Sequence, residues 1–128
     1  MLDNSFCTIT NKTKGHLLRC PFVSIKNKIL GNKYELGLSL LTSQKQKQIN
    51  LKYRGRNETT NILSFPFSKN SGEITIDPVK VKEDAPLFGM TYPKFFKYLF
   101  IHGCLHLKGF EHSSIMEKEE KKYLKIFS

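Results

Sequence analysis

Three of the four histidines in this chain of 128 residues lie within the eleven residues from His102 to His112. In a helix, His102 and His106 differ by about 40° in direction and about 6 Å in rise, so their imidazole rings lie side by side. Gly109 ends such a helix and permits a backbone turn that returns His112 to the same point. Three imidazole nitrogens leave a fourth position for water, as in catalytic rather than structural zinc sites. The spacing therefore predicts one zinc ion per chain, bound by these three histidines.

A metalloprotease is one alternative for this histidine spacing. The same spacing, glycine included, occurs in long-motif zinc proteases, in which a glutamate beside the first ligand is the general base. That position is Gly103 in this chain, so the proton acceptor expected for peptide hydrolysis is missing. A single histidine would more often be an ordinary core residue, but three at this spacing favour a metal site. The metalloprotease hypothesis is therefore disfavoured.

The elements that must position the histidines follow from hydrophobic periodicity. A helix predicted over 91–108 begins at Thr91, ends at Gly109 and is apolar on nearly every side, so it is expected to be central and buried. The remaining expected helices cover 21–30, 42–55, 79–84 and a segment from 113 onward, and the expected strands cover 5–10, 34–41, 62–67 and 73–77. The short turn between the last two strands predicts antiparallel pairing.

Together these elements predict an α+β fold. Its mixed four-stranded sheet carries packed helices, and the central buried helix bears the metal ligands. The length favours a single domain over residues 1–128. No apolar run approaches the roughly 20 residues that span a bilayer, and the N-terminus has no signal-peptide pattern. We therefore expect no membrane partner and a cytoplasmic location. Three cysteines without CxxC spacing indicate neither a disulfide framework nor a cysteine-type zinc finger.

The charge balance favours a polyanionic partner. The formal net charge is +10, and most of the excess lies in residues 1–60. Such an excess attracts nucleic acid through release of counterions, which makes RNA or a ribosome the favoured partner. The alternative is that the positive charge reflects a general bias toward lysine in the proteome rather than a polyanionic partner, because 18 of the 21 basic residues are lysines.

Three sequence blocks in order resemble a known family. The run from His102 to His112, preceded by INLKYRG at 49–55 and TNILSFPF at 60–67, resembles the YbeY endoribonuclease family of bacterial rRNA maturation factors. The resemblance implies a zinc-dependent, single-strand-specific endoribonuclease that acts in 16S rRNA 3′-end maturation and ribosome quality control. It implies rRNA and the small ribosomal subunit as partners, a ribosomal protein or GTPase as a further candidate partner, and no DNA.

The resemblance also assigns roles to residues. It makes His102, His106 and His112 the zinc ligands and Arg54 the arginine of the catalytic cleft. An arginine suits bidentate contact with a phosphate, so we expect Arg54 to hold the scissile phosphate while water on the metal acts as nucleophile or base. Without the resemblance, Arg54 would equally be a solvated residue at a helix end. Glu111 stands where the family usually has aspartate before the third histidine.

A second function stays open beside the enzyme. A ribosome assembly factor with a structural zinc site, which itself cuts nothing, would have the same charge and the same fold. A free fourth coordination position favours catalysis, but only if substrate can reach it.

Overall fold

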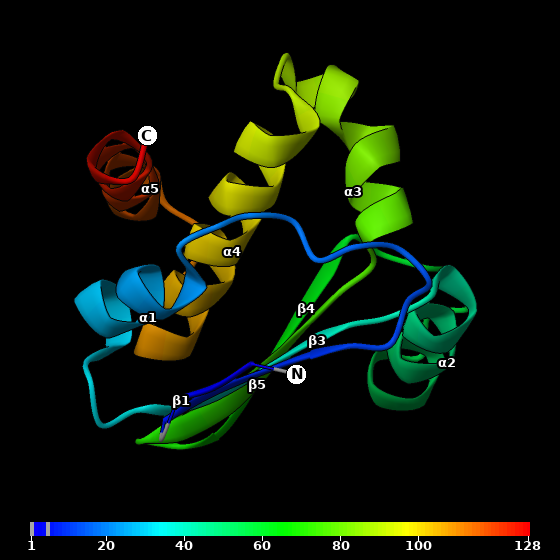
Figure 1. The fold of residues 1–128 in the computed structure, drawn as a ribbon, viewed down its shortest axis with the longest axis horizontal. Coiled ribbons are helices and arrows are strands. Elements are labelled where there is room, and N and C mark those ends of the chain that lie inside the picture. The colour runs from blue at the N-terminus through cyan, green and yellow to red at the C-terminus, as the bar shows by residue number, and fades with distance from the viewer. Residues whose placement is uncertain (1, 5) are drawn as a thin grey trace.

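A mixed sheet of five strands forms one layer of the molecule (Figure 1). The computed structural model describes residues 2–4 and 6–128. The order across the sheet is β1-β2-β3-β5-β4, in which β2, β3 and β5 run parallel and the outer pairs β1/β2 and β4/β5 are antiparallel. The strands are β1 (Leu2–Asn4), β2 (Cys7–Asn11), β3 (Glu35–Leu40), β4 (Ile62–Ser68) and β5 (Ser71–Ile76). The four expected strands are all present, except that residue 5 of the first lies outside the described residues, and β1 adds a short further strand at the edge.

Helices cover both faces of the sheet. The long helix α4 packs on one face with α1 and α5 beside it, and α2 lies against the other face (Figure 1). The helices are α1 (Phe22–Leu30), α2 (Ser43–Arg54), α3 (Pro78–Asp84), η1 (Ala85–Phe88), α4 (Tyr92–Lys108) and α5 (Ser114–Ile126). The expected α+β fold with helices packed on a mixed sheet is confirmed, and the short helix η1 is an addition to it.

The core lies between α4 and the sheet. Leu36, Leu38 and Leu40 alternate along β3 and are buried on the side of α4, as period-two spacing requires. Phe95 and Phe100 of α4 are fully buried. Because α4 is enclosed by the sheet, α1 and α5, nearly all of its circumference is apolar, and the expectation of a central buried helix is confirmed.

Gly103 lets α4 approach the sheet closely. A Cβ atom at this position would lie 3.0 Å from Cδ1 of both Ile62 and Ile74 and 3.2 Å from Oγ of Ser64. Such distances are shorter than ordinary van der Waals contact, so a larger residue would require these side chains, or the helix itself, to shift. The contact between α4 and the sheet therefore leaves little room for a side chain at the position where a zinc protease carries its glutamate.

The segment between α4 and α5 makes a tight reversal. Gly109 takes the left-handed conformation with φ of 112°, and the N–H of Phe110 donates to the carbonyl of Leu105 at 3.0 Å. Oγ of Ser113 then accepts from the N–H of Met116 at 3.2 Å and starts α5. Glycine tolerates this conformation without strain, so residues 109–113 turn back beside the end of α4.

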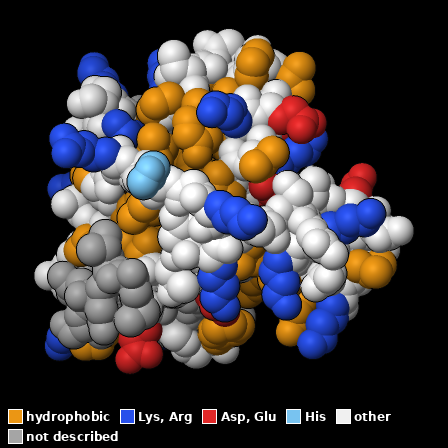
Figure 2. All heavy atoms as spheres, turned by 45° about the vertical axis from the view of Figure 1, so that its right-hand side comes forward, with side chains coloured by type: hydrophobic (Ala, Val, Ile, Leu, Met, Phe, Trp, Pro, Cys, Tyr) orange, Lys and Arg blue, Asp and Glu red, His pale blue; other side chains and the backbone are white. Residues whose placement is uncertain are grey.

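The surface is rich in basic side chains. On the face drawn in Figure 2, lysine and arginine side chains are spread widely with few acidic side chains between them. None of the helices in residues 2–4 and 6–128 is both long and apolar enough to cross a membrane.

Candidate metal centre and adjoining cavities

The three expected histidines meet at the end of α4. The ring centroids of His102 and His106 are 4.5 Å apart, and the ring centroid of His112 lies 5.0 Å from that of His102 and 4.8 Å from that of His106. One ring nitrogen from each residue lies within 4.8 Å of the corresponding nitrogens of the other two. His102 and His106 come from successive turns of α4, and His112 comes from the reversal that Gly109 permits. The three histidines are thus positioned to hold a metal ion.

Hydrogen bonds orient two of the three rings. Nδ1 of His102 bonds to a carboxylate oxygen of Glu120 on α5. Nδ1 of His106 lies 3.2 Å from the carbonyl oxygen of Phe110. A carbonyl or carboxylate accepts, so in this arrangement each Nδ1 carries the proton and Nε2 keeps its lone pair. Such contacts fix the tautomer and direction of metal-binding histidines, and the donor set therefore fits a divalent ion.

The electrostatics of His106 favour the form that binds metal. Burial, and after it the neighbouring His102 and His112, lower the pKa of His106 from its ordinary value. The hydrogen bond to the Phe110 carbonyl and the charge of Glu120 act in the opposite direction. A lowered pKa keeps imidazole neutral near pH 7, and neutral imidazole is the metal ligand.

Glu120 was not among the residues expected from the sequence. Its side chain is 5% exposed, and Oε1 also accepts from the hydroxyl of Tyr98 at 3.4 Å. Its position in the sequence could have indicated a buried role, because Glu120 lies on the same face of α5 as Met116 and Tyr123, which are also buried. A carboxylate on an apolar stripe needs a partner, and here the partner is His102.

Arg54 lies in the same cleft as the three histidines. This cleft has a volume of about 480 Å³, and Ser64 and Pro66 of the edge strand β4 form part of its wall. Arg54 is exposed, and none of the ion pairs in the part of the chain that the structure describes involves it. The arginine and the histidines expected from the sequence are therefore brought together, with the guanidinium available to an anion.

Buried amides of α2 hold the segment that follows Arg54. Nδ2 of Asn50 donates to the carbonyl of Glu58 at 2.8 Å, and Nε2 of Gln46 donates to the carbonyl of Thr60 at 3.3 Å. Both amides are nearly fully buried. Removing a partner from such a group costs stability, so these bonds fix the path from α2 to β4 and, with it, the end of α2 that carries Arg54.

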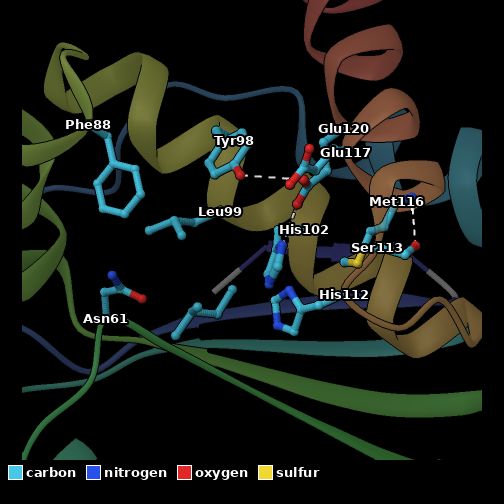
Figure 3. A pocket seen from close by; sticks show the side chains of 11 residues that line it. Asn61, Phe88, Tyr98, Leu99, His102, His112, Ser113, Met116, Glu117 and Glu120 are labelled. Atoms are coloured by element: carbon cyan, nitrogen blue, oxygen red, sulfur yellow. Dashed lines mark hydrogen bonds and ion pairs between the residues drawn. The ribbon is translucent and has the colours of Figure 1, made fainter.

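A second cavity adjoins the histidines on their other side. It measures about 310 Å³ and shares His102 and His112 with the cleft. Figure 3 shows its walls, which combine Phe88, Tyr98 and Leu99 with the carboxylates of Glu117 and Glu120. Glu111, the departure from the resembled motif, is exposed and is not among the residues that line either cavity. The histidines therefore lie between a cleft with an arginine and a cavity with acidic and aromatic walls.

Comparisons with known proteins agree on one family. The family model described as Endoribonuclease YbeY matches residues 8–128. Proteins named Endoribonuclease YbeY from Mycoplasmopsis synoviae and Thermodesulfovibrio yellowstonii are 34% and 39% identical over 99 and 90 residues. These alignments cover 70% and 65% of this chain, and the chain spans 64% and 56% of those two relatives.

Other matches cover more of both chains. The protein of the same name from Campylobacter jejuni is 33% identical over 118 residues, which is 86% of this chain and 87% of the relative. A solution structure from Thermotoga maritima superposes with a TM-score of 0.67 at 28% identity, over 93% of this chain and 87% of that one. That solved structure therefore shares the fold of this chain over nearly its whole length.

Proposed function

The chain belongs to the endoribonuclease YbeY family, and from this premise we propose that it is a zinc-dependent endoribonuclease, a hydrolase that cuts phosphodiester bonds in single-stranded rRNA. The proposal includes maturation of the 16S rRNA 3′ end and ribosome quality control in the cytoplasm. Its partners would be rRNA and the small ribosomal subunit, with a ribosomal protein or GTPase as a further candidate. The relatives carry the name endoribonuclease, and the site supports the same chemistry in this chain.

The observation that carries the proposal is the placement of Arg54 and the three histidines in one cleft. A guanidinium pairs with two phosphate oxygens at once, so Arg54 would bind the non-bridging oxygens of the scissile phosphate. His102, His106 and His112 would hold the zinc ion beside that phosphate. When bound, the ion supplies Lewis acidity and makes water a stronger nucleophile.

Residues around the site keep these groups in place. Glu120 accepts from Nδ1 of His102, and the Phe110 carbonyl accepts from Nδ1 of His106. Both rings are therefore held before substrate arrives, which reduces the reorganisation needed in the reaction. Cys104 lies midway between His102 and His106 in the sequence, about 160° around α4 from each of them, and is fully buried, so a fourth protein donor from that residue is not part of the proposal.

Cleavage of a single-stranded RNA from the 3′ region of 16S rRNA by the zinc-loaded protein tests the proposal. We expect Arg54→Ala to lower kcat/KM about 100-fold and His106→Ala to abolish cleavage and metal binding together. Arg19→Ala and His16→Ala are matched controls, because both side chains are exposed and line neither cavity at the histidines. Duplex RNA and single-stranded DNA of the same sequence are expected to remain intact.

Three outcomes would overturn the proposal. Cleavage that persists unchanged in both Arg54→Ala and His106→Ala would identify a contaminating nuclease. Absence of cleavage by a protein that binds one zinc ion and binds the small subunit would favour the assembly factor with a structural zinc site. Cleavage of a peptide substrate would revive the metalloprotease, against which the position of Gly103 argues.

A further inference from the structure

The two cavities that meet at His102 and His112 differ in charge. The cleft contains Arg54, whereas the second cavity contains the carboxylates of Glu117 and Glu120. Phosphate is attracted to the first and repelled by the second. If RNA is bound across the histidines, its backbone therefore belongs in the cleft, and an uncharged part of the same substrate belongs in the second cavity.

The second cavity has walls suited to a flat ring. Phe88 is 57% exposed, and Phe95 supports it from behind in a stacked arrangement with ring centroids 4.7 Å apart. Leu99 and Tyr98 complete the apolar side of the cavity (Figure 3). Unpaired bases of single-stranded RNA stack on such rings.

One polar group in this cavity has a fixed direction. Nδ2 of Asn61 donates to Oδ2 of Asp84 at 3.0 Å, and the other oxygen of Asp84 pairs with Nζ of Lys80 at 3.3 Å. A carboxylate paired with a lysine only accepts hydrogen bonds, so the amide nitrogen of Asn61 must face Asp84. The amide oxygen is then turned the other way, toward the side of the cavity on which Leu99 and His102 lie (Figure 3).

We propose that this cavity binds the base of the nucleotide beside the cleaved bond, with Phe88 as its stacking surface and Oδ1 of Asn61 as the acceptor for the amine on C6 of adenine or C4 of cytosine. The inference rests on the proposed function and adds a base preference to it. Adenine carries this amine on C6 and cytosine on C4, where guanine and uracil carry a carbonyl oxygen, and the amine of guanine lies on C2 instead. The chain is therefore expected to cut beside adenosine or cytidine in preference to guanosine or uridine.

The first experiment is cleavage of a single-stranded RNA pool with randomised positions, followed by sequencing of the ends. The zinc-loaded protein is expected to favour A and C about 5-fold at one position next to the cut, the value of one hydrogen bond. Asn61→Leu is expected to remove this preference. Asn57→Leu, an exposed asparagine in the preceding loop, is expected to retain it. An even base distribution in the unsubstituted protein would overturn the inference while leaving the proposed nuclease intact.

Asp84 acts here as a positioning residue, and its substitution gives a separate readout. Asp84→Asn places a donor as well as an acceptor opposite Asn61, so the amide no longer has one direction. We expect the base preference to fall below about 2-fold, while cleavage beside all four bases continues. A preference that survives Asp84→Asn would show that the orientation of Asn61 does not set it.

The amine itself is tested by its deletion. Replacing the favoured adenosine with purine riboside removes only the exocyclic amine, and we expect a loss of about 5-fold in kcat/KM for the unsubstituted protein and none for Asn61→Leu. Binding is followed independently of cleavage by the NMR signals of the Asn61 side-chain amide. AMP is expected to shift them more than purine riboside monophosphate does, and equal shifts would overturn the inference even if the chain cut no RNA.

Discussion

Glu120 of α5 bonds to Nδ1 of His102 of α4, so the orientation of one candidate ligand depends on the packing of two helices. The carboxylate is almost fully buried. A buried carboxylate that faces a metal-binding imidazole stabilises both the ring position and the charge of the ion. The C-terminal helix is thus part of the candidate metal centre, although none of its residues belongs to the histidine cluster.

Glu120→Gln is expected to weaken zinc binding. The substitution keeps the size of the side chain but removes its charge, and loss of such a partner lowers metal affinity by about 10- to 100-fold. The dissociation constant is measured by competition with a chromophoric chelator. Glu119→Gln is the matched control, since Glu119 faces Lys122 at 3.5 Å on the outside of the same helix. Equal affinities in the two variants would show that the contact with His102 does not tune the site.

Zinc is expected to raise the thermal stability of the folded chain. A ligand that binds only the native state stabilises it by about 2.7 kcal/mol at 100 times its Kd, because the three histidines come together only on folding. The midpoint Tm is measured with and without zinc, and excess chelator should reverse the increase. His106→Ala should show no increase and His16→Ala the full increase. A similar increase in both variants would place the ion elsewhere.

Gly103→Ala is expected to destabilise the protein by about 1–3 kcal/mol. The added methyl group would meet Cδ1 of Ile62 and Cδ1 of Ile74 at 3.0 Å, so these side chains or α4 itself would have to shift. The free energy of unfolding is measured in denaturant. Gly15→Ala is the control, because its Cβ would have no neighbour closer than 3.8 Å. Comparable losses at the two positions would contradict the close helix–sheet contact.

Cys20 is expected to be unreactive in the native state. Burial raises its pKa to about 12, although the nearby charge of Lys97 opposes this. The thiol is therefore protonated at pH 8, and only the thiolate reacts with disulfide reagents. Labelling followed by peptide mapping should show Cys20 protected until the chain is unfolded. Rapid modification of Cys20 in the native protein would contradict the raised pKa.

The same thiol predicts a pH dependence of stability. Its folded pKa lies above its unfolded value, so its contribution is complete below about pH 9 and is lost as the pH rises toward 12. Between pH 9 and 11, the free energy of unfolding should fall more steeply with pH for the unsubstituted protein than for Cys20→Ala. Parallel curves would show that the ionisation of Cys20 is not linked to folding.

Local patterns were sufficient to predict most elements and the histidine cluster. Thr91 and Gly109 mark the ends of α4 because a cap and a left-handed turn are local properties of the chain. The spacing of His102 and His106 is likewise fixed by the helix itself. His112 could be assigned because only three residues lie between it and the helix end.

Contacts between distant segments could not be predicted in the same way. The parallel pairing of β2, β3 and β5 depends on how helices pack across the sheet. The hydrophobic periodicity within one segment carries no information about this pairing. Glu120 and His102 are 18 residues apart, and Asn61 and Asp84 are 23 apart. Each pair forms only when separate elements meet, so the ring orientation and the second cavity required the structure. The place of Arg54 beside the histidines came from resemblance rather than from spacing.

The reversal at Gly109 gives the three candidate donors unequal anchoring. Two belong to a helix packed in the core, whereas the third is carried by the five-residue connection between α4 and α5 at the surface. An ion captured here would escape through brief opening of that connection, long before global unfolding. Its residence time would therefore be governed by the short link between the last two helices, and stiffening that link would slow metal exchange without changing the ligands.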